Sequence, residues 1–371
     1  MAGPTTRTHT TWATDRVTSL SEFWAIVALH LGLVGAWRLM LVCKAARVGA
    51  KDFLNTLPGL VVCGGSAEAR VIVNDVWRLD LATLRWEAMP ALGAARTHHA
   101  CCAVRSSLVV IGGLISSEEL TGGVEMLAEG GVAVTNQPPL SCGGIGGGAA
   151  IAVDESDSAA GQVLLLGGFD DDMDVVTSVN LVDLATGMCT PQPNLLYLRD
   201  MFVAVRLPDG RIVCAGGLDD RVITTILSSV EVFEPPAQGA LDTAWTWREA
   251  PAMSVERVAS RGCVLSDGRF AVLGGMDNNE EPLSACEALL VGEDEHWKIL
   301  SPMHEARSDF ACAAVARCIV VAGGYGGLTP LGLLIYLRSA EVFDEVSDRW
   351  LQLPCDLPHN LGMTGMGSAL L

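Results

Sequence analysis

A short apolar run that ends in two glycines occurs six times along this chain and constrains its fold more than any other feature. Successive pairs are 48 to 58 residues apart. A period near fifty residues, with one apolar strand per unit, is typical of an array of small β-sheets. Glycine permits close backbone approach and a positive φ, so each pair predicts a sharp exit from its strand. The pairs are Gly64–Gly65, Gly112–Gly113, Gly167–Gly168, Gly216–Gly217, Gly274–Gly275 and Gly323–Gly324.

Each unit divides into four strands, here called A to D. Strand A is short and apolar, a tight turn such as Asp267–Gly268 leads to strand B, and strand B carries the apolar run. A loop leads to strand C, and strand D lies near a tryptophan. The pattern predicts an all-β fold, a six-bladed β-propeller over residues 57–371. The chain enters on strand B at Leu60, so we expect Met363–Leu371 to supply the missing strand A and close the ring.

These units resemble kelch repeats, and the resemblance covers Leu60 to Leu371. The tyrosine position of strand C is held by Leu79, Leu127, Val182, Phe233, Leu289 and Phe343. The strand D tryptophan appears as Trp86, Trp247 (or Trp245), Trp297 and Trp350. The second and third units lack it, and Cys189 stands at this position in the third. The resemblance implies a protein-recognition propeller in which the loops after the glycine pairs share a face with the loops before strand A.

The N-terminal part of the chain has a different pattern. Residues 1–17 show no apolar periodicity and are predicted to be a disordered lead, whereas residues 18–56 are predicted to be helical. The helical segment resembles a degenerate F-box, with Ile26, Leu29, Leu33, Leu41 and Val42 as its docking residues. The resemblance implies a substrate adaptor of a cullin-RING ubiquitin ligase, whose helices bind a Skp-family linker. The alternative is a helical plug without a partner.

Charge and composition narrow the classes of partner. The chain has 43 acidic and 24 basic residues, a formal charge of −19, so its surface repels nucleic acid and favours a basic protein or peptide. The apolar stretch Phe23–Val42 is long enough to span a membrane, but it contains His30 and Arg38, so we do not expect a membrane partner. The twelve cysteines show no paired metal spacing and fit a reducing compartment, which favours the cytoplasm or the nucleus.

Charged residues recur at two places in the repeat that are expected to share a face. Acidic residues follow the glycine pairs, and an arginine stands just before strand A in four units. One hypothesis is a recognition face that captures a partner through arginines near the channel mouth and carboxylates around the rim. The alternative is that each arginine pairs with a nearby acid and joins the blades, because a structural role recurs with the repeat. The candidate residues are Arg96, His98, Arg199, Asp219, Arg257, Asp277 and Arg307.

We find no catalytic constellation in the sequence. His98 and His99 are adjacent on a strand, so they point to opposite faces and cannot chelate one metal together. The sequence therefore predicts no enzyme activity, no cofactor and no metal site. We expect a protein-recognition module, either a ligase adaptor or a kelch interaction scaffold without ligase coupling. An enzyme on the same scaffold is a third, weaker alternative.

Overall fold

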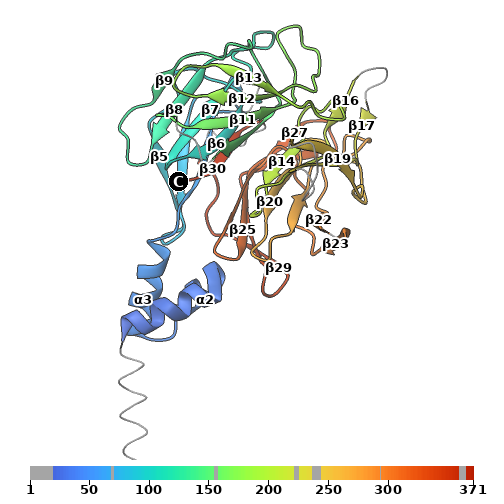
Figure 1. Cartoon of the computed structure of the whole chain (residues 1–371). Helices are drawn as coiled ribbons and strands as arrows, with labels where there is room; N and C mark the ends of the chain where they lie inside the picture. The colour runs from blue at the N-terminus through green and yellow to red at the C-terminus, as the bar shows by residue number, and fades with distance from the viewer. Residues whose placement is uncertain are drawn as a thin grey trace, which may run out of the picture.

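The computed structural model describes residues 20–67, 71–153, 158–220, 225–235, 244–292, 294–358 and 365–371. Within these ranges the chain forms two helices followed by six four-stranded antiparallel sheets (Figure 1). The predicted lead, residues 1–17, lies outside the described residues. The sheets are the six predicted blades, and each is ordered A-B-C-D from the channel outward.

The first three blades have the following strands. Blade 1 contains β30 (Gly367–Leu370), β1 (Leu60–Cys63), β4 (Val76–Asp80) and β5 (Arg85–Met89). Blade 2 contains β6 (Ala100–Val104), β7 (Ser107–Ile111), β8 (Val124–Ala128) and β9 (Thr135–Gln137). Blade 3 contains β10 (Ala149–Val153), β11 (Gln162–Leu166), β12 (Val179–Asp183) and β13 (Cys189–Gln192).

The last three blades repeat this order. Blade 4 contains β14 (Val203–Arg206), β15 (Ile212–Ala215), β18 (Val230–Glu234) and β19 (Thr246–Ala250). Blade 5 contains β20 (Arg261–Val264), β21 (Phe270–Leu273), β22 (Cys286–Leu290) and β23 (His296–Leu300). Blade 6 contains β24 (Ala311–Val315), β25 (Cys318–Ala322), β28 (Ala340–Asp344) and β29 (Arg349–Gln352). Short hairpins extend the B–C loops of blades 1, 4 and 6: β2 (Ser66–Ala67) with β3 (Val71–Ile72), β16 (Leu218–Asp219) with β17 (Thr225–Ile226), and β26 (Tyr325–Leu328) with β27 (Leu334–Tyr336).

The ring closes as predicted. β30 pairs antiparallel with β1, with Leu60 opposite Leu370 and Cys63 opposite Gly367. The last strand of the chain thus becomes strand A of the blade that the first strand begins. This pairing removes the two open sheet edges that the ends of the array would otherwise present.

A belt of backbone hydrogen bonds runs around the channel just before strand A and passes through all six blades. Each link joins the residue two positions before one strand A to its equivalent in the next blade, with N···O distances of 2.8 to 3.0 Å. All six residues have φ between 48° and 66°, so their amide and carbonyl groups point to neighbouring blades. The belt runs through Gly365, His98, Gly147, Met201, Ala259 and Asp309.

The first glycine of each pair meets the connection to the next strand A. A Cβ at Gly216 would lie 2.5 Å from the carbonyl oxygen of Arg257, and one at Gly274 would lie 2.4 Å from that of Arg307. Both glycines have positive φ. Any larger residue there would separate neighbouring blades, which is the physical reason for the recurring pair.

The helices α2 (Ser21–Leu39) and α3 (Lys44–Leu54) pack on blades 1 and 6 and share one hydrophobic core with them. The Leu33 amide donates to the Ala316 carbonyl in the A–B turn of blade 6, and the Trp37 indole donates to Leu81 beyond strand C of blade 1. Gly32 takes φ 74° against Ala316, where a Cβ would lie 2.5 Å from the carbonyl oxygen. The A–B and C–D turns lie at the end of the strands opposite the B–C loops. The helices therefore cover the face of the propeller remote from those loops.

Candidate functional site

The loops after the glycine pairs and the belt before strand A enclose a pocket of about 410 Å³ at the channel mouth. We call the face that carries it the top face. Ile72, Leu114, Met276, Leu334 and the rings of Tyr325 and Tyr336 supply the apolar lining. Thr97, His98, Ser308 and Asp309 supply the polar lining from the belt. The predicted sharing of one face by the two loop sets is confirmed by this pocket.

His98 lies in this pocket, as part of the predicted recognition face. Burial lowers the pKa of His98, and His99 and Arg261 lower it further, against the opposing charge of Asp309. The imidazole is therefore neutral at neutral pH and can either donate or accept a hydrogen bond. Its neighbour His99 lies against the channel cavity and turns its Nε2 toward blade 1, 3.5 Å from the Cys63 sulfur. Both histidines precede β6, and His98 has φ 54°, so the prediction that they alternate along a strand is wrong.

The four predicted arginines are buried inside the blades rather than exposed on the top face. Each donates from Nη1 to the carbonyl of the first glycine in the pair of its own blade, at 2.6 to 2.9 Å. Each also forms a buried ion pair with the glutamate at the second position of strand C. The pairs are Arg96 with Glu125, Arg199 with Glu231, Arg257 with Glu287 and Arg307 with Glu341.

The glutamates also bind the connection that arrives from the preceding blade. The second carboxylate oxygen of each accepts a hydrogen bond from a backbone N–H group of that connection. The Leu196 amide donates to Glu231 at 2.7 Å, and the Ser254 amide donates to Glu287 at 3.1 Å. The prediction that the arginines face a partner is therefore corrected to the structural alternative. They join the incoming connection to strands B and C of the blade it enters.

The two predicted acidic residues on the B–C loops have different environments. Asp277 accepts from the amides of Asn279 and Glu281, and the pKa of its carboxyl is lowered first by the Glu281 amide. Its carboxylate therefore shapes its own loop. Asp219 lies on β16, half-buried beside the loop that leads to β17. The acidic rim is completed by Asp220, Glu280 and other exposed carboxylates.

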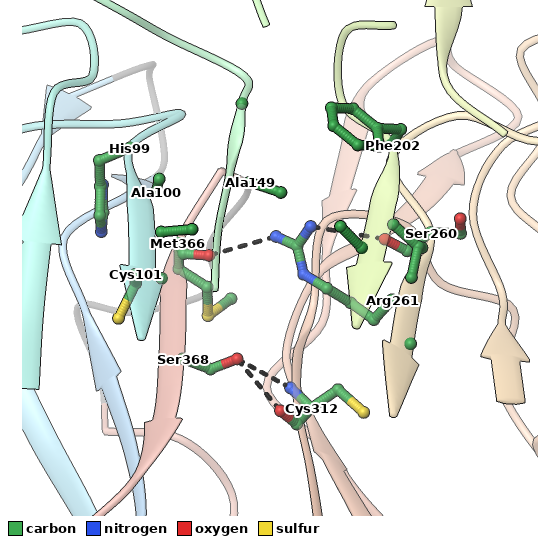
Figure 2. A pocket seen from close by; sticks show the side chains of 16 residues that line it. His99, Ala100, Cys101, Ala149, Phe202, Ser260, Arg261, Cys312, Met366 and Ser368 are labelled. Carbon is green, nitrogen blue, oxygen red and sulfur yellow. Dashed lines mark hydrogen bonds between the residues drawn. The ribbon is translucent and has the colours of Figure 1, made fainter. Parts of the chain in front are cut away.

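Below the top-face pocket the six A strands enclose a channel cavity of about 170 Å³. Arg261 of β20 reaches into it and donates to the carbonyls of Phe310 at 2.7 Å and Met366 at 3.2 Å, as Figure 2 shows for Met366. Ser368 on β30 contacts the backbone of Cys312 at 3.2 Å across the same cavity (Figure 2). Arg261 is not among the residues predicted from the sequence, because its position on strand A carries no charged residue in the other blades.

A sulfur-rich cluster lies at the boundary of blades 1 and 2, beside the channel cavity that His99 and Cys101 help to line. The Cys63 sulfur is 3.5 Å from Nε2 of His99 and 4.0 Å from the Cys101 sulfur. The pKa of Cys63 is lowered to about 5, first by the hydrogen bond with Cys101 and then by His99 and Arg96, which together outweigh burial. Within the described part of the chain, no three His, Cys, Asp or Glu side chains are arranged to hold a metal ion.

The helical docking residues divide into two groups. Ile26, Leu29, Leu41 and Val42 are exposed, and Leu41 is 83% exposed. Leu33 is fully buried in the core shared with blades 1 and 6, so its predicted role in docking a partner is corrected. α2 also has the length and hydropathy of a membrane span, although a third of that window is buried within the protein.

Comparisons with known proteins agree with this architecture. The kelch motif family matches residues 306–355, which contain the four strands of blade 6. An F-box/kelch-repeat protein of Arabidopsis thaliana is 40% identical over 60 residues, 16% of this chain and 15% of the relative. Kelch-like protein 7 of Mus musculus is 31% identical over 140 residues, 36% of this chain and 20% of the relative. The matched segments thus span a fifth or less of these relatives.

A solved structure reproduces the fold over most of the chain. The structure of YjhT matches with a TM-score of 0.61 at 12% identity and covers 80% of this chain and 98% of that chain. At this identity the likeness shows the fold alone. Together with the blade pairing, it shows that the chain is a six-bladed β-propeller, closed by its C-terminal strand and preceded by two helices, with a kelch motif in blade 6.

Proposed function

We propose that this protein is a recognition adaptor, which holds a protein partner at the top face of the propeller and a Skp-family linker of a cullin-RING ubiquitin ligase at its helices. The observation that carries the proposal is the exposed apolar surface of α2 and the turn after it, at the end remote from the top-face pocket. Kelch propellers are commonly protein-binding modules, and the similarity of short segments to F-box/kelch-repeat proteins supports the coupling to a ligase.

The helical surface has the character of an interface. Phe23, Ile26 and Leu29 on α2 are exposed, and Leu41 and Val42 follow in the turn before α3. Several exposed large apolar side chains on one helix and the turn after it are typical of a contact with another protein. Because α2 is anchored to blades 1 and 6 through Leu33 and Trp37, a linker bound there would be held in a fixed position relative to the top face.

The top-face pocket suits a basic segment with an apolar or aromatic anchor. Its floor offers two tyrosine rings and aliphatic side chains, while Asp309 and the carboxylates of the rim supply negative charge. Complementary charge accelerates association and orients the partner, whereas burial of the anchor supplies affinity. We therefore infer a protein or peptide partner with lysine or arginine beside an apolar residue.

The alternative function is a kelch interaction scaffold without ligase coupling. It is favoured by the burial of Leu33, Ala36 and Leu39 against the propeller, since a helical segment that shares the core of the ring stabilises it without a further partner. In that case the exposed residues of α2 would contact nothing, or would contact a protein other than the linker.

Co-expression with a Skp-family linker followed by affinity capture separates the two functions. We expect the full chain to retain the linker, and Leu41→Asp and Val42→Asp to lose it by at least tenfold while melting like the parent. The matched control is Leu331→Asp, which places the same charge on an exposed leucine of the top face and should leave capture unchanged. Failure of the parent to retain the linker would leave the scaffold function.

A further inference from the structure

Blade 3 lacks the two contacts that fix the incoming connection to the blade in blades 4, 5 and 6. In blades 4, 5 and 6 the strand D tryptophan donates its indole N–H to a carbonyl of the preceding connection, each at 2.8 Å. In blade 3 Cys189 takes that place, opposite Val182, as Trp247 lies opposite Phe233 in blade 4. The arginine and glutamate positions are also changed, to Ile145 and Asn180.

Cys142 lies on the connection that enters this blade, and its sulfur is 2.7 Å from the sulfur of Cys189. Two hydrogen bonds of the adjacent Ser141 hold the two segments together. The Cys189 amide donates to Oγ of Ser141 at 2.9 Å, and the Ser141 amide donates to the Gly187 carbonyl at 2.9 Å. The two sulfurs therefore meet across a fixed contact, and Cys142 is exposed to reagents in solution.

We propose that Cys142 and Cys189 form a thiol-oxidation site, which closes to a disulfide and cross-links the connection between blades 2 and 3 to strand D of blade 3. The oxidant is a low-molecular-weight disulfide such as oxidised glutathione. One cysteine thiolate attacks it, forms a mixed disulfide and releases one glutathione thiolate. The other cysteine, as its thiolate, then attacks the protein sulfur and releases the second glutathione. Two electrons and two protons leave the protein thiols and appear on two molecules of glutathione.

The disulfide would supply the anchor that this blade lacks. In blade 4, for example, an indole hydrogen bond and a buried ion pair join the connection to its blade, whereas in blade 3 both sets of residues are replaced and two cysteines meet. The same connection continues to Gly147 of the belt, and the Gly144 amide donates to Asp171 on the acidic rim at 3.0 Å. Oxidation would thus stiffen one sector of the top face.

The cysteine pair Cys63–Cys101 and the single Cys43 can be compared with the proposed oxidation site. Cys63 and Cys101 are 4.0 Å apart at the blade 1–blade 2 boundary, and Cys63 is fully buried, so reagents in solution have poor access to this pair. Cys43 is exposed just before α3, where its sulfur accepts from the Ala46 amide.

The test uses the full chain in glutathione buffers of increasing oxidised fraction, followed by acid quenching, alkylation and peptide mass spectrometry. We expect a peptide pair linked through Cys142 and Cys189, and a melting temperature about 5 °C higher than that of the reduced protein, as for the closure of a loop of this length. Cys142→Ser and Cys189→Ser should each lose the shift and retain glutathione on the remaining cysteine. Cys43→Ser should behave like the parent.

The proposal is overturned if both thiols are alkylated separately in excess oxidised glutathione, or if either pairs with a different cysteine. Should a serine variant fail to fold, the peptide pair from the parent protein decides the question alone. Linker capture by the helices does not enter this measurement, so its outcome is independent of the proposed adaptor function.

Discussion

Four arginines occupy the same place in four blades, and their burial explains why they recur. Each guanidinium is enclosed with a glutamate and a glycine carbonyl, so removal of either partner would leave a buried charge, at a cost of about 3–5 kcal/mol. In blade 3 both members are replaced, by Ile145 and Asn180, which avoids such an orphaned charge. Residues that recur at the same position in several blades stabilise the fold, whereas residues that line the top-face pocket, such as His98, Tyr325 and Tyr336, differ between blades.

Asp200, which follows one of these arginines, gives a pH-dependent prediction. It is buried, and burial raises the pKa of its carboxyl to about 7, helped by Asp309 and Asp220 and opposed by the Met201 amide. A carboxyl whose pKa is raised on folding stabilises the protein below its unfolded pKa, near 4, and this stability is lost as pH rises through about 7. Asp200→Asn should therefore be more stable than the parent at pH 8, by up to about 4 kcal/mol, and similar at pH 4.

The measurement is the melting temperature of parent and Asp200→Asn at intervals from pH 4 to pH 9. Other titrating groups are shared by the two proteins, so the difference between the curves reports Asp200. A difference that does not change with pH would show that this carboxyl titrates normally.

At the scale of elements, strand β30 decides whether six sheets become one ring. It lies between β1 of its own blade and the neighbouring A strands, and its residues Gly367 and Ser368 line the channel. Without it, β1 becomes an exposed apolar edge and the belt loses Gly365. A repeat array is stabilised by contacts between neighbours, and closure adds the last of these contacts.

Deletion of Met363–Leu371 should therefore abolish cooperative unfolding and promote aggregation. The transition is followed by circular dichroism and light scattering during heating. The matched control is Ser368→Ala, which keeps the strand and removes only the contacts with Cys312, and it should retain one sharp transition. A truncated chain that melts like the parent would show that closure is unnecessary.

At the scale of the whole molecule, the helices and the ring form one hydrophobic unit. Residues of α2 and α3 share a core with strands of blades 1 and 6, and the connection from Leu54 to Leu60 is short (Figure 1). The proposed linker surface and the proposed partner pocket are therefore at opposite ends of a single body. Their separation is set by packing rather than by a flexible hinge.

Substitutions at two leucines of the helical segment distinguish a residue that packs in the core from one that is predicted to dock a partner. Leu33→Asp places a charge in the shared core and should destabilise the protein by at least about 3 kcal/mol, because Leu33 is fully buried. Leu41→Asp changes an exposed residue and should leave the free energy of unfolding within about 0.5 kcal/mol of the parent. Urea denaturation of both variants provides the measurement. Equal destabilisation would mean that the turn after α2 is packed in solution.

The sequence by itself determined the number of blades, their strand order and the closure by the C-terminal strand. Glycine pairs, apolar runs and turns are local sequence signals. They recur once per blade, so the number of glycine pairs equals the number of blades. Of the docking residues predicted from the sequence, Ile26, Leu29, Leu41 and Val42 are exposed and their docking role stays a prediction, whereas Leu33 is buried in the shared core.

Only the tertiary structure decided which charged residues face solvent and which lie inside. Arg257 and Glu287 are 30 residues apart, and nothing local shows that they enclose each other. The channel arginine and its carbonyl partners, and the sulfur pair of Cys142 and Cys189, are likewise brought together by the packing of separate strands and loops. The physical reason is that strand formation follows from neighbouring residues, whereas burial depends on segments that are distant in the chain.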